Sequence, residues 1–190
     1  VKEKISKTAL WLGDINVISL LNNNRFFIDF GYSAIEERAF VPNISNSLKI
    51  TSNLILTSKI YTFSYQKTSP QVLGIGFKYF FGTEENLNWI TSIQKVDLKG
   101  LTDYRLSSIT LNISNSYIFN KIEIFYGIGS NFYKQRSYNI YQDIPSKIEG
   151  QINYIDINFL IKFDILNIKM NLISSIDNNI ISLIIQKGVF

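Results

Sequence analysis

Three carboxylates are the side chains of this sequence with the clearest capacity for chemistry. Asp29, Glu123 and Asp156 fall on the polar face of segments in which apolar and polar residues alternate. Two such groups can serve as general acid and base, but lysines share that face, and buried opposite charges are more often structural pairs than catalysts. We therefore predict no enzymatic activity. The expected interior polar network consists of Asp29, Lys78, Lys121, Glu123, Asp156, Lys162 and Lys169.

Other chemical motifs are scarce. The chain contains neither His nor Cys, which removes the commonest general base near neutral pH, thiol nucleophiles, disulfides and the usual zinc ligands. Gly74-Ile75-Gly76 and Gly127-Ile128-Gly129 lack the third glycine and the following helix of a dinucleotide site, so we interpret them as packing glycines. Asn43-Ile44-Ser45 and Asn112-Ile113-Ser114 match the glycosylation sequon, and we assign them no role. We expect no cofactor and no metal.

Composition indicates one folded domain over residues 1–190. The sequence is 46% apolar and 18% charged, against a globular norm of about 25% charged residues. Its net charge of +4 comes without a block of like charge, so we predict no nucleic-acid partner. No apolar run is long enough for a membrane-spanning helix. The chain opens with Val1-Lys2-Glu3-Lys4, without an apolar signal core, and we expect a processed or truncated start.

The elements that would carry these residues are strands, because apolar residues recur at every second position. In residues 153–164 one face is apolar and the other is mostly polar. The same alternation recurs in residues 26–33, 72–81, 108–114, 121–129 and 168–172. The apolar positions of 153–164 are Ile155, Ile157, Phe159, Ile161 and Phe163.

Turn-forming residues divide these strands. Nine connections imply ten strands, and an even number of antiparallel strands is what a closed up-and-down barrel requires. Eight strands are the alternative count, because residues 7–21 could be an irregular strand or a short helix, and residues 44–65 could be one strand or two. The expected connections are residues 22–24, 41–43, 67–70, 83–86, 99–103, 120, 135–150, 164–167 and 177–179.

The apolar faces favour a barrel that crosses a membrane. They continue for about five alternate positions, or about 10 residues, which is the length that a tilted strand needs to cross a bilayer. Aromatic residues sit near the strand ends, where amphipathic rings prefer the membrane interface. The predicted fold is therefore all-β, an antiparallel up-and-down transmembrane β-barrel. The aromatic residues are Trp11, Tyr79, Phe81, Trp89, Tyr117, Phe119, Phe132 and Tyr133.

The run from residue 180 to Phe190 resembles the terminal strand of bacterial outer-membrane β-barrel proteins. That resemblance implies that Phe190 is a membrane-insertion signal, and that the partners are membrane lipid, the barrel-insertion machinery and other envelope proteins. It implies a location in the bacterial outer membrane, with mitochondrial-type barrels as the alternative. In that family, apolar residues stand at every second position counted back from the end. Here Ile184 and Ile180 keep this pattern, and Gly188, Gln186 and Ser182 interrupt it.

The strand number bears on function. Eight to ten strands enclose a lumen that side chains such as Phe125, Tyr154 and Leu160 can fill, whereas a general porin needs about 16 strands. We expect a non-enzymatic barrel that acts as a membrane anchor, a subunit of an envelope assembly, or a narrow channel. The long segment 135–150 would face outward, with termini and short turns in the periplasm. Its candidate recognition residues are Arg136, Tyr138, Tyr141 and Asp143.

Two other arrangements fit the same pattern. A soluble, lipocalin-like barrel would point its Ile and Phe faces inward around an apolar ligand. A subunit of a large complex would cover the same faces with protein instead of lipid.

Overall fold

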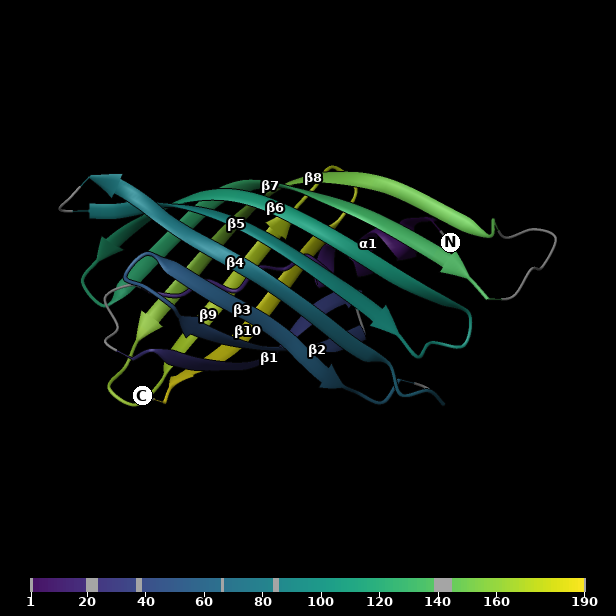
Figure 1. Cartoon of the computed structure of the whole chain (residues 1–190), viewed down its shortest axis with the longest axis horizontal. Coiled ribbons are helices and arrows are strands. Elements are labelled where there is room, and N and C mark those ends of the chain that lie inside the picture. The colour runs from purple at the N-terminus through teal and green to yellow at the C-terminus, as the bar shows by residue number, and fades with distance from the viewer. Residues whose placement is uncertain are drawn as a thin grey trace.

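The computed structural model describes residues 2–19, 24–36, 39–65, 67–83, 86–138 and 145–189. Within these ranges the chain forms one helix and ten strands, with the helix inside the ring of strands (Figure 1). The elements are α1 (Lys2–Leu12), β1 (Phe26–Glu36), β2 (Ala39–Lys49), β3 (Leu54–Thr62), β4 (Gln71–Thr83), β5 (Asn86–Lys99), β6 (Tyr104–Phe119), β7 (Ile122–Ser137), β8 (Lys147–Lys162), β9 (Asn167–Ser174) and β10 (Asn179–Gly188).

The strands close into an antiparallel up-and-down barrel, as predicted. Each strand pairs with its neighbours in sequence, and β1 closes the ring against β10 from the pair Phe27↔Gly188 to the pair Ala34↔Ile181. An open up-and-down sheet would expose unpaired edges at its first and last strands. Closure removes these edges along the segments where β1 and β10 pair.

The predicted number of strands is confirmed, and of the open alternatives a short helix in residues 7–12 and two strands within residues 44–65 hold, whereas one predicted connection is wrong. The described residues 7–19 supply no strand: α1 occupies the first part, and residues 14–19 continue without regular structure inside the barrel. Residues 41–43 are no connection, because they lie within β2 and pair with β1. A break at residues 50–53 instead separates β2 from β3. The strand expected before residue 22 is missing, and the break at residues 50–53 adds one, so the count stays at ten.

The barrel has two unlike ends. At the turn end, where β1 begins and β10 stops, the connections are residues 50–53, 84–85, 120–121 and 163–166. At the loop end, where α1 lies, they are residues 37–38, 63–70, 100–103, 138–146 and 175–178. The predicted long connection of residues 135–150 is shorter than expected, because β7 continues to Ser137 and β8 begins at Lys147. Longer connections at one end are typical of the outward side of outer-membrane barrels.

The wall is uneven in height. β6, β7 and β8 have 16 residues each, whereas β9 has 8 and β10 has 10. β8 pairs with β9 only from Ile155 onward, so the loop-end half of β8 extends beyond its neighbour. The wall therefore steps down from β8 to β9 at the loop end.

Candidate functional site

Residues 2–19, which we call the plug, fill the lumen. Helix α1 places Ile5, Ala9 and Leu12 on one buried face, at the spacing of one and two helical turns. The helix ends at Leu12, and the backbone N–H of the next residue, Gly13, donates to the carbonyl of Ala9. A Cβ at Gly13 would collide with the side-chain amide of Asn131 on β7, so the close approach of plug and wall requires glycine there.

The loop-end layer of the interior is apolar. The buried side chains of α1 pack against wall residues that include Val72, Leu98 and Ile152. The Trp11 and Phe63 rings meet edge to face, with centroids 5.9 Å apart. This is the larger of the two apolar clusters of the described interior, and burial of the aromatic rings accounts for much of its stabilisation.

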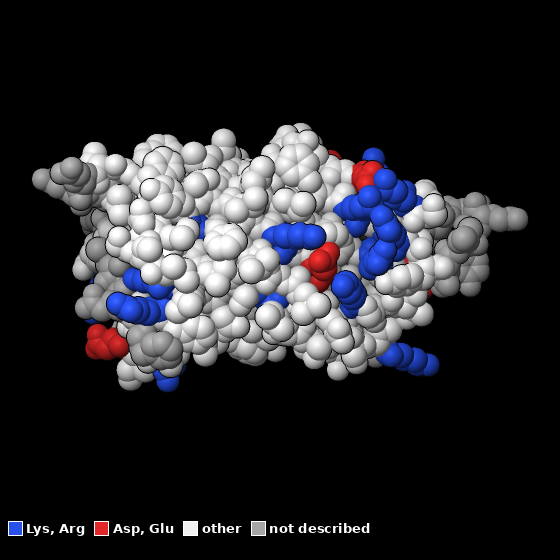
Figure 2. Space-filling view, in the orientation of Figure 1, with Lys and Arg blue, Asp and Glu red and all other residues white. Residues whose placement is uncertain are grey.

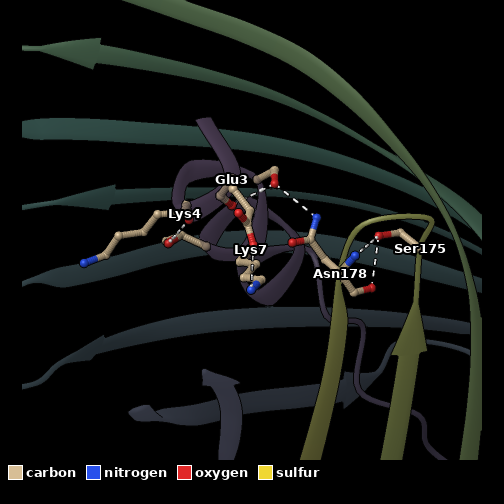
Figure 3. A network of polar contacts seen from close by, with 7 residues as sticks. Glu3, Lys4, Lys7, Ser175 and Asn178 are labelled. Carbon is tan, nitrogen blue, oxygen red and sulfur yellow. Dashed lines mark hydrogen bonds and ion pairs between the residues drawn. The ribbon is translucent and has the colours of Figure 1, made fainter. Parts of the chain in front are cut away.

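A polar contact fixes the first turn of α1 to the barrel rim. Figure 3 shows the helix beside the turn between β9 and β10, where the Asn178 side-chain amide donates to the Ser6 hydroxyl at 3.1 Å. Ser175 closes that turn by donating to the carbonyl of Asn178 at 3.0 Å. On the helix itself, Lys7 pairs with Glu3 at 3.0 Å, one turn away. The plug is thus anchored at its start as well as along its length.

Wall side chains satisfy the carbonyls at the C-terminal end of α1. Asn131 donates to the Ala9 carbonyl at 2.9 Å, and Gln94 donates to the Leu12 carbonyl at 3.1 Å. The Lys59 ammonium donates to the Leu12 carbonyl at 3.4 Å. A helix end has unpaired carbonyls and partial negative charge, so amide donors and a cation are suitable partners.

The middle layer of the interior is polar and centres on Asp14, which is fully buried. Its carboxylate accepts hydrogen bonds from Asn43 at 2.7 Å, from Ser182 at 2.9 Å, and from Asn171. These donors come from β2, β10 and β9. One residue of the plug therefore joins three strands, and two of them belong to the far end of the chain.

A buried ion pair lies next to this centre. The Lys169 ammonium is 2.7 Å from the Asp29 carboxylate and donates to the Val17 carbonyl of the plug at 2.8 Å. The second carboxylate oxygen of Asp29 accepts from the Ser45 hydroxyl at 3.0 Å, and Ser45 in turn accepts from Asn16 at 2.7 Å. This pair binds wall to plug, since a buried charge needs both a counter-charge and hydrogen bonds.

The remaining predicted carboxylates have separate partners. Asp156 accepts from Asn112 at 2.7 Å and from Asn158 at 2.8 Å. Glu123 pairs with Lys162 at 2.8 Å. Asp156 and the buried Lys78 line a cavity of about 10 Å³, which is about the room of one water molecule. Asp29, Glu123 and Asp156 are thus each engaged with their own donors or cation.

The turn-end layer is apolar again. Val17 and Ile18 of the plug pack against Phe27, Phe125 and Leu160 of the wall. The lumen is therefore closed in three successive layers: an apolar one around α1, a polar one around Asp14, and an apolar one around Ile18.

The outer face is the chemical opposite of the interior. Its exposed residues include Phe30, Ile75, Ile157 and Leu183, which come from strands on all sides of the ring. On β7 the outward positions from Ile122 to Phe132 rise about 33 Å along the strand at about 3.3 Å per residue. A tilt of about 45° reduces this to about 23 Å, close to the apolar band of about 25 Å in outer-membrane barrels. We call this apolar surface the belt.

Aromatic rings border the belt at the turn end. Tyr79, Phe81 and Trp89 are exposed, and the Phe81 ring stacks on both neighbours with centroids 6.4 Å apart. Tyr117 and Phe119 lie at the same end of β6 and are exposed as well. Amphipathic rings favour the interface between membrane and water.

The structure places the predicted site residues in three groups. Asp29, Lys78, Glu123, Asp156 and Lys169 are buried in the interior, and Lys162 is half-buried beside Glu123. The prediction for Lys121 is wrong: it lies in the turn between β6 and β7 and is exposed, because the alternation stops one residue before β7 begins.

Of the predicted recognition residues and the predicted insertion signal, the structure describes Arg136 and Tyr138. Arg136 is exposed on β7 instead of in a loop, and Tyr138 is exposed just after that strand. Tyr141, Asp143 and Phe190 lie outside the described residues.

Sequence reasoning missed the centre of the interior. Asp14 and Lys59 were not predicted to lie there. The available signal was Gly13-Asp14 directly after residues spaced as on one helical face, a pattern typical of a helix end. Among the described residues no group of His, Cys, Asp and Glu could hold a metal ion. No helix in the described ranges has the length and hydropathy that a membrane crossing needs.

Comparison with known proteins gives likenesses among solved structures alone. No protein-family model matches the chain, and no curated protein matches it. The chain is similar to the outer membrane protein Omp33 of Acinetobacter baumannii, with 6% identity over 87% of this chain and 98% of that chain and a TM-score of 0.45. It is also similar to Ail, the attachment invasion locus protein of Yersinia pestis, with 11% identity over 88% of this chain and 98% of that chain and a TM-score of 0.35.

Proposed function

We propose that this chain is a non-enzymatic integral barrel of the bacterial outer membrane whose lumen is closed by its own plug. It acts as a membrane anchor that presents its loop end outward, not as an open pore. One observation carries the proposal: large apolar side chains are exposed on all sides of the ring, with Lys95 of β5 as an outward charge among them, while buried charged and polar residues of the same strands point inward and several of them bond to residues 2–19.

The physical argument rests on what each face requires. Exposed Ile, Leu and Phe around a whole circumference would be costly in water, where monomeric proteins rarely expose large apolar patches. In lipid the same side chains are well solvated, and the closed ring satisfies the backbone hydrogen bonds. A lipocalin-like carrier needs the reverse arrangement, with the apolar faces around a cavity, and here the plug occupies the interior.

Fractionation of the full chain tests the membrane location. We expect the protein in detergent-extracted membranes, with a band on a gel that shifts between unheated and boiled samples, because a closed barrel resists unfolding by detergent alone. A monomer that stays in the soluble fraction without detergent contradicts the proposal.

Conductance in a planar lipid bilayer tests the plug. The wild-type barrel should show no steady conductance, since three packed layers close its lumen. Replacing Trp11 and Asp14 together by Ala removes a buried ring and the centre of the polar layer, so we expect channel openings. A Trp89→Ala variant, which alters an exposed ring of the wall, is the matched control and should stay closed. Steady conductance of the wild-type protein would contradict the assignment as a closed anchor.

A further inference from the structure

The outer face of β5 to β8 bears a row of cations at the loop end. Figure 2 shows basic side chains gathered toward the end of the molecule at which the N label lies in Figure 1, with fewer charged side chains in the middle. The residues of this row, which we call the basic row, are Lys99, Arg105, Arg136 and Lys147.

The strand register makes these four residues direct neighbours. Arg105 on β6 lies opposite Arg136 on β7, and Arg136 lies opposite Lys147 on β8. On the other side, Leu98 of β5 pairs with Leu106, so the next residue, Lys99, is beside Arg105. Like charges directly opposite one another on adjacent strands are destabilising unless something compensates them.

The protein compensates only part of the row. Glu149 pairs with Lys147 at 2.8 Å and with Lys134, two residues from Arg136 along β7, at 2.9 Å. Within the described part of the chain, no carboxylate lies within ion-pair distance of Arg105 or Arg136, although both are exposed. Two guanidinium groups are thus held side by side with their donors free for an anion.

The surroundings of the row suit an anion that carries hydrocarbon. A hollow of about 300 Å³ lies beside it, lined by residues that include the cations Lys99, Arg105, Lys134 and Arg136 and one carboxylate, that of Asp97. Toward the turn end, Ile109 and Phe132 are the next large apolar residues on β6 and β7, and both are exposed. They lie four positions from the arginines, or about 13 Å along the strand, where the belt begins.

We propose that the basic row binds the phosphate groups of a phosphorylated lipid whose acyl chains lie against the belt. The planar guanidinium fork matches phosphate oxygens with two parallel hydrogen bonds, and a dianionic group relieves the repulsion between Arg105 and Arg136. Continuity with the belt favours a lipid over a free anion. This inference rests on the proposed membrane location.

Native mass spectrometry of the full barrel in detergent micelles tests the site. Phosphatidic acid serves as the probe, and phosphatidylcholine, whose phosphate bears a cationic substituent, serves as the reference lipid. The test variant carries Arg105→Gln and Arg136→Gln. The matched control carries Lys121→Gln and Lys187→Gln, which remove the same charge from two exposed positions near the turn end. Inorganic phosphate is added in a separate arm.

We expect wild-type and control proteins to retain phosphatidic acid in preference to phosphatidylcholine. The test variant should lose apparent affinity for phosphatidic acid by at least about tenfold, since two charge-assisted interactions are removed. Equal losses of affinity in both double variants would mean that binding depends on net charge alone, and this would overturn the site. Displacement of the lipid by inorganic phosphate at a similar concentration would overturn the lipid as occupant.

Failure of the membrane proposal would give a different experimental result from failure of the basic row. If the membrane location is wrong, the wild-type protein remains soluble without detergent and its gel band does not shift on heating. A barrel that passes both of those checks yet shows no preference for phosphatidic acid contradicts the basic row alone.

Discussion

The two faces of β8 differ completely although their residues alternate along one strand. Ile157 points outward and is 38% exposed, whereas its neighbour Asn158 points inward and is 2% exposed. Asn158 donates to Asp156 at 2.8 Å, two positions away on the inner face. Ile157 has no polar group to satisfy, whereas inside the wall the plug and the opposite strands supply partners for many of the buried polar groups.

This contrast explains why the interior can be polar at all. Polar and charged side chains can be buried when hydrogen bonds and counter-charges satisfy them, and the plug supplies Asp14 and several backbone carbonyls for that purpose. The outer face receives no such contacts from the plug, and large apolar side chains predominate on it. The inner face should therefore be sensitive to loss of a partner, and the outer face should be sensitive to gain of a charge.

Loss of a buried charge on the inner face should have the largest effect. Lys169→Met removes the ion-pair partner of the buried Asp29, whose remaining hydrogen-bond donor is the Ser45 hydroxyl, and leaves the Val17 carbonyl without its donor. Breaking a buried pair from one side costs about 3 to 5 kcal/mol. We expect the free energy of unfolding, measured by urea titration of the barrel in micelles, to fall by that amount.

The double variant Lys169→Met with Asp29→Asn is the control for this measurement. It removes both charges and keeps an oxygen that can accept from Ser45, so it should recover much of the loss. If the double variant is as unstable as the single one, the loss comes from packing and not from an uncompensated charge.

Gain of a charge on the outer face should have the next largest effect. An arginine in place of Ile157 would lie within the belt, and a midplane arginine costs about 2 to 4 kcal/mol in barrels of this kind. We expect Ile157→Arg to prevent membrane assembly, seen as loss of the heat-shifted gel band from the membrane fraction. Ile157→Leu is the control and should assemble as the wild type does. Normal assembly of the arginine variant would contradict a lipid-facing belt.

The outer face was predictable because its pattern is local. Alternation over residues 153–164 shows which side chains share a face, and it needs no knowledge of which strands are neighbours. The same rule placed Phe125, Tyr154 and Leu160 inside, where they are buried. It failed at Lys121, where the chain turns and alternation no longer applies.

The inner centre was not predictable because its contacts are distant in sequence. Asp14 bonds to Ser182, which lies 168 positions away, and to Asn171, which lies 157 positions away. Those pairs exist only after the ring has closed and the plug has entered it, so they depend on the register of β9 and β10 and on where α1 ends. Residues 7–21 show neither clean alternation nor a long helical period, and periodicity alone left their structure open.

Loss of a single amide on the inner face should have the smallest effect of the three. Asn158→Ala removes one of the two donors to Asp156, and Asn112 keeps the other at 2.7 Å. One hydrogen bond contributes about 0.5 to 1.5 kcal/mol, so the urea midpoint should fall modestly and membrane assembly should be normal. Because Asn158 is adjacent to Ile157, the two variants differ in which face they alter and not in position along the barrel. Collapse of the Asn158 variant together with survival of Ile157→Arg would mean that the faces are reversed.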